Sequence, residues 1–242
     1  MRVIVQTVFQ RYELKYLLTR EMRDALLSDL SSRLKPDAYG KTTVRNLYFD
    51  NDSYFLIRRS LEKPRFKEKI RLRSYALPKA EDLVFVELKR KFDSVVYKRR
   101  VSAKQAEAIR WLTGGASRAE DSQISREVDA FLSCYGPLAP TVFLSYDRQA
   151  YLGLDDPDFR VTFDENILAQ RTNLALDSPV FGEDLLDGRW VLMELKTSAA
   201  LPLWMCELLS RYGLYKTSFS KYGTAYQKLI FPENPILNTN KG

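Results

Sequence analysis

The stretch from Lys67 to Arg73 is the sequence feature that most limits how this chain can fold. Side chains alternate between the two faces of a β-strand, and here four cations share one face: Lys67, Lys69, Arg71 and Arg73. The opposite face carries Glu68, Ile70 and Leu72. Like charges spaced at about 7 Å repel one another, so an anion is expected to compensate them. Taken alone, the stretch also fits a solvated strand surface.

Composition narrows the chemistry that this chain can perform. It has 242 residues, a net charge of +7 and a pI near 9.3, which favour one large domain and an anionic partner. Nucleic acid, a phosphate compound and a membrane surface all fit that charge. The sequence contains no histidine, which excludes histidine-based zinc sites and Ser-His-Asp catalysis. A metal would be held by carboxylates, which suits Mg²⁺ or Mn²⁺.

The cysteines and the apolar runs bear on the compartment. Cys134 and Cys206 lack metal-binding spacing and lie in apolar helical contexts, so we expect two buried free thiols in a reducing compartment. The apolar stretch at the N-terminus is too short, and charged residues follow it too soon, for a signal peptide. The sequence also has no run of 18 apolar residues. These features predict a soluble, cytoplasmic protein.

Hydrophobic periodicity predicts alternating groups of strands and helices. Eight strands are expected at residues 9–16, 44–49, 67–73, 83–91, 94–101, 140–152, 159–170 and 190–196. Six helical segments are expected at residues 19–30, 54–61, 103–112, 123–134, 203–211 and 218–231. No linker divides the chain, so residues 1–231 form one predicted domain and residues 232–242 a terminal tail.

Nearly every predicted strand carries charges on one face and apolar side chains on the other. The helices need an apolar sheet surface to pack against, so the apolar faces should point outward and the charged faces inward. Eight antiparallel strands of this length can close into a barrel without free edges. The expected fold is therefore α+β, an eight-stranded antiparallel β-barrel with helices packed on the outside. Its interior would be a wet, basic tunnel for a polyanion.

A Glu-Leu-Lys pattern occurs on three of these strands. It begins at Glu13, Glu87 and Glu194, and each glutamate shares a strand face with the lysine two residues later. If the three glutamates converge inside the barrel, they form an all-oxygen site for a divalent metal. The alternative is that each glutamate makes an ordinary cross-strand ion pair.

The order of these short motifs resembles a known family. They are Arg11-Tyr-Glu-Leu-Lys15, Leu47-Tyr-Phe-Asp50, Lys69-Ile-Arg-Leu-Arg73, Phe85-Val-Glu-Leu-Lys89, Val96-Tyr-Lys-Arg99, Tyr146-Asp-Arg148, Arg160-Val-Thr-Phe-Asp164, Met193-Glu-Leu-Lys196 and Ser218-Phe-Ser-Lys221. Each is weak alone, but their joint order, from about Arg11 to Leu229, resembles the VTC domain. This is the polyphosphate polymerase module of the vacuolar transporter chaperone complex, within the CYTH-like triphosphate tunnel metalloenzymes.

The resemblance implies roles for individual residues. The implied phosphate ligands are Lys15, Arg71, Arg73, Lys89, Lys98, Arg148, Arg160, Ser220 and Lys221, with Arg59 as a weaker candidate. Glu194 resembles the principal Mn²⁺ or Mg²⁺ ligand, and Glu13 and Glu87 could assist it. Ser218 departs from the pattern, because some members have lysine there, which leaves chain-end binding or catalytic rate open.

The implied activity transfers the terminal phosphoryl group of a nucleoside triphosphate, usually ATP, onto a polyphosphate chain. Residues proposed to hold the triphosphate are Arg71, Arg73, Lys89, Arg148 and Arg160. With water as acceptor the same site would be a triphosphatase, and without turnover it would be a polyphosphate-binding module. A nucleic-acid-binding barrel is not expected, since no ordered aromatic-basic motif for base stacking is found. A membrane partner and the oligomeric state are left open.

Overall fold

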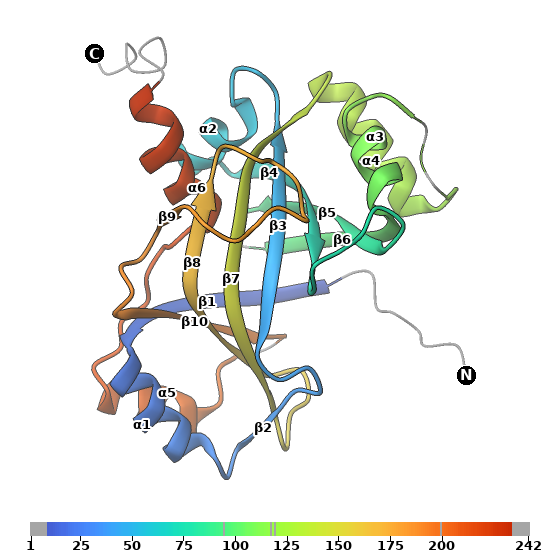
Figure 1. Ribbon diagram of the computed structural model, residues 1–242. Coiled ribbons are helices and arrows are strands. Elements are labelled where there is room, and N and C mark those ends of the chain that lie inside the picture. Colours follow the sequence, from blue (N-terminus) through green and yellow to red (C-terminus); the bar gives the residue numbers. More distant parts are fainter. Residues whose placement is uncertain (1–8, 94, 117, 119, 199, 234–242) are drawn as a thin grey trace.

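The computed structural model describes residues 9–93, 95–116, 118, 120–198 and 200–233, and Figure 1 shows their arrangement. Ten strands lie in this part of the chain: β1 (Phe9–Thr19), β2 (Leu34–Pro36), β3 (Thr42–Asp50), β4 (Phe66–Ser74), β5 (Leu83–Phe92), β6 (Val95–Lys104), β7 (Ala139–Gly153), β8 (Arg160–Gln170), β9 (Glu183–Asp184) and β10 (Trp190–Thr197). Eight of them match the predicted strands, while the short β2 and β9 were not predicted.

Six α-helices occur in the same described residues: α1 (Arg20–Leu30), α2 (Phe55–Leu61), α3 (Gln105–Leu112), α4 (Gln123–Tyr135), α5 (Leu203–Arg211) and α6 (Lys221–Ala225). The predicted N-cap of α1 is confirmed, because the Thr19 side chain accepts a hydrogen bond from the Met22 backbone amide. The predicted final helix is shorter than expected. After α6, the chain forms a π-helical turn at Tyr226–Ile230 and a 3₁₀ turn at Phe231–Glu233.

All strand pairs in the sheet are antiparallel, and the order is β2-β7-β3-β4-β5-β6-β1-β10-β8-β9. Strand β7 pairs with β3 and also with β8, so the order curves back on itself. The β1–β6 junction is short, with three residue pairs between described residues. This junction does not close the sheet along the length of the strands, so the predicted barrel is not confirmed. The structure shows an antiparallel, sheet-rich α+β fold.

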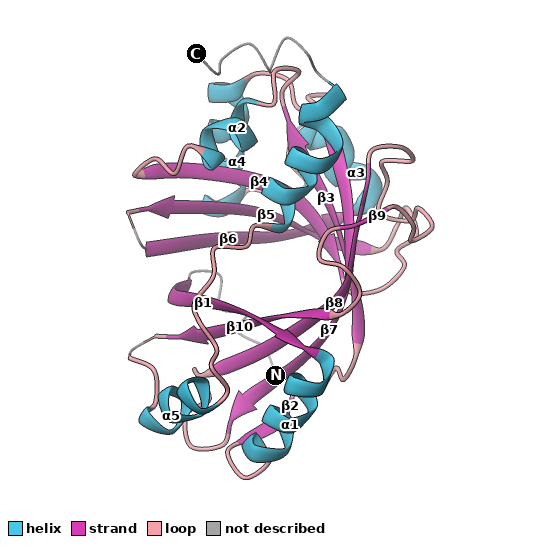
Figure 2. Cartoon of the chain, turned by 90° about the vertical axis from the view of Figure 1, so that its left-hand side faces the viewer, coloured by secondary structure: helices cyan, strands magenta, loops and turns pink. Residues whose placement is uncertain are grey.

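The sheet is strongly curved (Figure 2). Charged side chains from non-adjacent strands meet on its concave side. Lys89 of β5 contacts Glu13 of β1 at 2.8 Å, although β6 lies between these strands. Arg73 of β4 donates to the hydroxyl of Tyr146 on β7 across the intervening β3. Side chains of non-adjacent strands can meet in this way only across a concave surface.

The apolar strand faces lie under helices, as the sequence predicted for the cationic strand. Ile70 and Leu72 of β4 are fully buried in a cluster that contains Trp111 of α3 and Phe131 of α4. A second cluster packs α1 and α5 against the outer faces of β1, β8 and β10. The alternation of β4 therefore separates two environments, a dry helix-covered side and a charged concave side.

The C-terminal helical segment covers part of the concave side. Tyr222 and Tyr226 pack in one cluster with Val142 and Leu144, which share their face of β7 with Arg148. The Tyr222 ring stacks on Tyr48 of β3 with ring centroids 4.3 Å apart. Its hydroxyl also bonds the side chains of Thr141 and Asp50, at 2.8 and 3.2 Å. The start of this segment is thereby fixed beside the charged groups.

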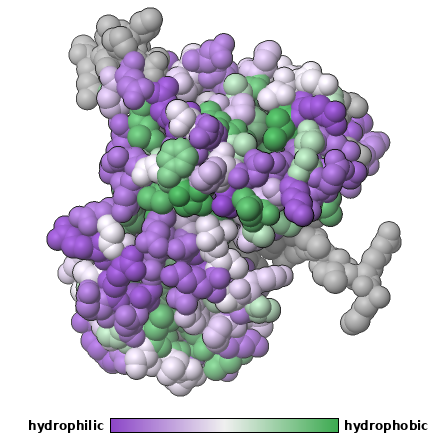
Figure 3. Space-filling model, in the orientation of Figure 1, coloured by the Kyte–Doolittle hydropathy of each residue, from purple (hydrophilic) through white to green (hydrophobic). Residues whose placement is uncertain are grey.

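Neither cysteine is fully buried. Cys134 is exposed and Cys206 is partly exposed, so the prediction of two buried thiols is wrong, because both side chains lie toward the outer surfaces of their helices. The first strand residue predicted at Ser94 and most of the predicted tail lie outside the described residues. Within the described part, no helix is long and apolar enough to cross a membrane. Hydrophilic side chains make up much of the surface in Figure 3.

Truncating Leu72 should destabilise the fold. Leu72→Ala leaves a cavity beneath α3 and α4, and we expect the free energy of unfolding to fall by about 2–5 kcal/mol. Urea-induced unfolding followed by circular dichroism would measure the change. Leu83→Ala is the control, since Leu83 is 70% exposed and its truncation should change stability little. Wild-type stability in Leu72→Ala would contradict the assignment of this face to the core.

Candidate functional site

The concave side of the sheet gathers basic side chains from six strands and from the start of α6. Its cations are Lys15, Lys69, Arg71, Arg73, Lys89, Lys98, Arg100, Arg148, Lys196 and Lys221. The carboxylates that contact them belong to Glu13, Glu87, Asp164 and Glu194. Cations outnumber carboxylates, so the surface is electropositive and suited to a polyanion.

Glu87 is the centre of one group of cations, which we call the Glu87 cluster. Its carboxylate accepts from Arg71 at 2.9 and 3.0 Å and from Arg100 at 2.9 Å. Lys98 lies 2.7 Å away and Arg73 lies 3.7 Å away. Burial alone would raise the pKa of Glu87, but the surrounding cations, led by Arg73 and Lys98, hold it well below its usual value. The Glu87 carboxylate therefore stays ionised and holds the four cations together.

Side chains of β3 and β7 orient the two arginines of the cationic strand. Arg71 donates to the hydroxyl of Tyr48 at 2.6 Å. Arg73 donates to the Asn46 side-chain oxygen and to the Tyr146 hydroxyl, each at 2.9 Å. The sequence reasoning did not assign Asn46, Tyr48 or Tyr146 to the site. Alternation along β3 and β7 places these three side chains on a common face. The sequence alone does not tell whether they hydrogen-bond to arginines or only pack in the core.

A second group, the Glu194 cluster, joins β7, β8, β10 and α6. Arg148 contacts both oxygens of Asp164, at 2.6 and 2.7 Å. Lys221 lies 2.6 Å from Asp164 and 3.2 Å from Glu194. Glu194 also has Lys196 at 3.3 Å, Arg148 at 3.6 Å and Lys15 at 3.7 Å. Asp164 and Glu194 thus share Arg148 and Lys221. Asp164 is therefore part of the site, although it was not among the predicted site residues.

The charges of the Glu194 cluster stabilise one another. Burial would raise the pKa of Glu194, but Lys221, Lys196 and the other cations lower it well below its usual value. Burial would lower the pKa of Lys221, but Asp164 and Glu194 raise it above that of an ordinary lysine. Burial would also raise the pKa of Asp164, but Arg148 and Lys221 lower it below its usual value. Glu194, Lys221 and Asp164 are therefore all ionised at neutral pH.

Polar contacts connect the two clusters with the C-terminal segment. Lys89 donates to Glu13 at 2.8 Å, and Lys15 donates to the backbone oxygen of Phe219 at 2.7 Å. Lys69 donates to the Ser220 hydroxyl at 3.2 Å. That hydroxyl also caps α6 by accepting from the Gly223 amide. Ser220 is therefore a structural cap as well as a neighbour of the cations.

Three groups of the concave side have a pKa near neutrality. Burial and the nearby Lys89 and Lys15 lower the pKa of Lys69 to about 7. Burial likewise lowers the pKa of Lys98 to about 7, with contributions from Arg73 and Arg100, against the attraction of Glu87. Burial raises the pKa of Tyr75, but the adjacent cations, led by Arg73, reduce it to about 7. The site is thus strained by excess positive charge.

Two residues predicted as site members, Arg160 and Arg59, lie less centrally. Arg160 is opposite Lys196 in the sheet, and its guanidinium pairs with Asp37 at 2.9 Å. Arg59 lies on α2, is largely exposed and pairs with Glu62 at 3.0 Å. Among the described residues, no hydrogen bond or ion pair joins it to either cluster. Ser218 is also exposed. The structure brings the other predicted residues together.

The predicted convergence of three glutamates is not found. No group of three or more acidic or sulfur side chains within the described residues is arranged to hold a metal ion. Glu87 is surrounded by cations, and Glu13 pairs with Lys89. Glu194 also contacts four cations, but it differs from Glu87 in having a second carboxylate beside it, Asp164, which shares Lys221 and Arg148 with it. Glu194 and Asp164 are therefore the pair of carboxylates suited to a divalent ion. Mg²⁺ is commonly held by one or two carboxylates together with phosphate oxygens and water, so this pair is sufficient.

A family model for the VTC domain matches residues 10–230, which is most of the chain. This chain belongs to the VTC-domain family. The match spans every element from β1 to the π-helical turn, so both clusters lie within the family's region. It also confirms the resemblance inferred from the order of the strand motifs. No curated protein matches the chain.

Two solved structures resemble this chain at low sequence identity. A candidate adenylate cyclase from Bacillus halodurans superimposes with a TM-score of 0.59 at 15% identity, covering 93% of this chain and all of that one. A second candidate adenylate cyclase, from Vibrio parahaemolyticus, has a TM-score of 0.47 at 11% identity and covers 89% of this chain and 97% of its own. The first likeness shows a common fold.

The family membership of this VTC-domain protein agrees with its electropositive site. Both support a protein of the triphosphate-tunnel type that handles phosphoryl groups. Enzymes of this type generally use divalent metals. The Glu194 cluster is the place on the concave side with suitable carboxylate donors.

Removing the Glu87 charge should destabilise the ligand-free VTC domain, because its four cations would then repel without compensation. Glu87→Gln is expected to lower the free energy of unfolding by about 3–5 kcal/mol, and inorganic tripolyphosphate should restore more stability than it adds to the wild type. Denaturant unfolding with and without tripolyphosphate measures both effects. Glu81→Gln is the control, since Glu81 is an exposed partner of Lys104. Wild-type stability of Glu87→Gln without the anion would contradict this role.

Anion binding should take up protons at alkaline pH. At pH 8 Lys69 and Lys98 are largely neutral and Tyr75 largely ionised, and a bound polyanion favours protonation of all three. Tripolyphosphate affinity should therefore fall as pH rises from 7 to 9. Calorimetry at pH 8 in buffers of different ionisation enthalpy measures the net proton uptake. Lys69→Gln should take up fewer protons than the wild type, and this difference excludes protons exchanged by the anion itself. Equal uptake by the two proteins would refute the prediction.

Proposed function

We propose that this chain is a metal-dependent phosphotransferase that moves the terminal phosphoryl group of a nucleoside triphosphate, ATP, onto a polyphosphate chain. The observation that carries the proposal is the convergence of cations from six strands and α6 on one concave side, where they exceed the carboxylates. Such an arrangement is costly in the absence of an anion and is compensated by a polyphosphate ligand. VTC-domain membership supports the same substrate class.

The proposed mechanism relies on positioning and charge neutralisation. Phosphoryl transfer requires the attacking and leaving oxygens to be in line and the charge on the phosphoryl oxygens to be stabilised. Residues proposed to hold the triphosphate are Arg71, Arg73, Lys89, Arg148 and Arg160, assisted by Lys15, Lys98, Ser220 and Lys221. Arginine suits this task because its guanidinium can bind two phosphate oxygens at once.

Glu194 and Asp164 are the proposed ligands of Mn²⁺ or Mg²⁺. When bound there, the metal would neutralise charge on the transferred phosphoryl group. Arg148 and Lys221 then serve two purposes, because they contact these carboxylates and face the proposed phosphate path. Glu87 is proposed to position Arg71 and Arg73, which revises its predicted role as a metal ligand. Glu13 is proposed to position Lys89 in the same way.

A triphosphatase is the second candidate, and the C-terminal segment favours it. Tyr222 and Tyr226 cover part of the concave side by packing against Val142 and Leu144. This restricts the room available to a long polymer, whereas water as acceptor needs little space. The third alternative, a binding module without turnover, shares the same phosphate contacts. The predicted cytoplasmic location and a membrane partner stay hypotheses.

The decisive experiment incubates the purified protein with ATP and Mn²⁺ and separates the products. Long-chain polyphosphate supports the polymerase, released phosphate without polymer supports the triphosphatase, and tight binding without turnover supports the binding module.

Glu194→Ala should reduce turnover by at least tenfold through loss of a metal ligand. Arg71→Ala should weaken triphosphate binding, most strongly at low salt. Arg189→Ala is the control, because Arg189 is exposed and pairs with Asp187. Unchanged turnover in Glu194→Ala would refute the metal assignment.

A further inference from the structure

A pocket of about 670 Å³ lies at the rim of the sheet, outside both clusters. It is formed by α2, by the start of β4 with the residues before it, and by the last residue of α4. The side chains used below are Phe55, Arg59, Arg65, Phe66, Lys67 and Tyr135, all from its lining. The volume suits a small organic molecule, since ligand pockets commonly measure about 300–1,000 Å³.

Aromatic rings line the pocket and are unusually exposed. The Phe55 side chain is 47% exposed and the Phe66 side chain is 45% exposed. The Phe55 and Tyr135 rings are tilted, with centroids 6.0 Å apart. The Tyr135 hydroxyl is held by Glu68 at 2.7 Å, which fixes the ring on that wall. These are the faces on which a planar, aromatic ligand can stack.

Positive charge connects this pocket to the concave side. Lys67 lines the pocket, yet it belongs to the same strand face as Lys69 and Arg71. Its ammonium donates to the Ser60 backbone oxygen at 3.1 Å. Burial and the nearby Lys91, Lys63 and Lys89 lower the pKa of Lys67, so its environment is cationic. Lys67 therefore lies where the pocket meets the cationic face of β4, so a phosphate held by Lys67 would be next to Lys69.

Other charges at the rim largely neutralise one another. Arg65 pairs with Asp93 at 2.9 Å, and Arg59 pairs with Glu62 at 3.0 Å. Glu68 is held by Arg90 at 2.5 Å. Both arginine pairs are exposed and therefore weak, so either guanidinium can turn to a phosphate at low cost. The occupant that fits this pocket has one flat aromatic part and an anionic tail.

We propose that the rim pocket binds the base of the nucleoside triphosphate, with the base stacked against Phe55 and Phe66 and the phosphates directed past Lys67 onto the concave side. The inference rests on the proposed function and adds the recognition of the nucleoside, which neither charged cluster provides. It also gives Arg59 a place beside the first phosphates, although Arg59 lies outside both clusters.

The test compares a ligand that has a base with one that lacks it. Calorimetry with Mg²⁺ measures the affinity of the β,γ-imido analogue of ATP and that of inorganic tripolyphosphate. Phe55→Ala and Phe66→Ala should each weaken binding of the analogue about fivefold or more, because stacking on an aromatic side chain is lost. Binding of tripolyphosphate should be unchanged. Circular dichroism establishes that each variant is folded.

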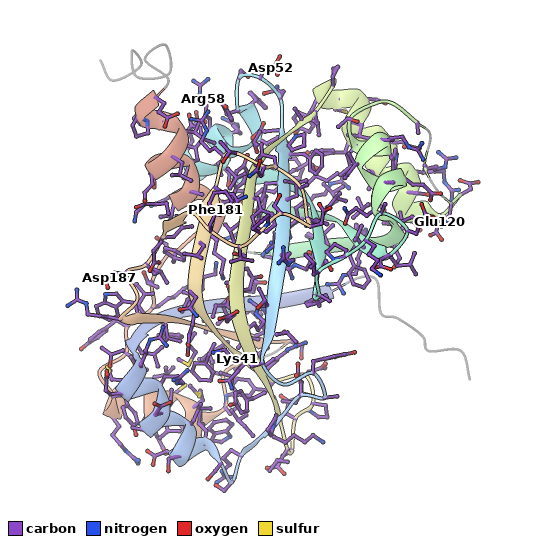
Figure 4. All side chains as sticks on the ribbon, in the orientation of Figure 1. Lys41, Asp52, Arg58, Glu120, Phe181 and Asp187 are labelled. Carbon is purple, nitrogen blue, oxygen red and sulfur yellow. The ribbon has the colours of Figure 1, made fainter. Side chains whose placement is uncertain are left out.

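Phe181→Ala is the matched control. Phe181 is 42% exposed, does not line the pocket and lies away from α2 in Figure 4. Its truncation should leave both affinities unchanged.

The outcomes separate this inference from the proposed function. Selective loss of analogue binding in the two phenylalanine variants supports the base pocket. Unchanged analogue binding in these variants, or an equal loss for both ligands, overturns the base pocket. The proposed function still stands in that case if the wild type binds tripolyphosphate. If the wild type binds neither ligand, the proposed function fails and the base pocket fails with it.

Discussion

Repulsion among the cations of the concave side is the constraint on which the site depends. Ten of the described basic groups gather there. The fully buried Glu87 carboxylate contacts four of them. A buried carboxylate with this many partners is stable only because the cations outweigh the cost of its burial. Carboxylates among the described residues of this side do not balance the remaining positive charge. This charge is a preorganised binding potential, since the cations already stand where a polyanion requires them.

The two clusters divide the work of this site. The Glu87 cluster is rich in arginines that tyrosine and asparagine side chains hold in place, which suits the gripping of phosphate oxygens. The Glu194 cluster has two carboxylates that share Arg148 and Lys221, which suits a hard metal ion. Lys69 and Lys89 lie between these regions and link them to Ser220 and Glu13. The proposed base pocket at the rim extends the same cationic strand toward a nucleoside.

The C-terminal segment connects fold and function. Lys221 lies at the start of α6 and contacts both Asp164 and Glu194, so α6 completes the Glu194 cluster. Tyr222, the next residue, anchors α6 to Tyr48, Thr141 and Asp50. Asp50 in turn accepts from the first amides of α2, so it ties α6 to the helix that borders the rim pocket. Movement of α6 would therefore disturb the proposed metal donors and the rim together.

The sequence by itself determined the two-sided strands. The alternation of Lys69, Ile70, Arg71 and Leu72 requires a dry side and a charged side, and the order of such strands was enough to identify the family. Tertiary structure alone decided which charges meet. Lys89 reaches Glu13 and Arg148 reaches Glu194 because sheet curvature brings non-neighbouring strands together, and strand spacing in the sequence does not encode that curvature. For the same reason, the three predicted glutamates separate into different ion pairs, and Asp164 becomes the partner of Glu194.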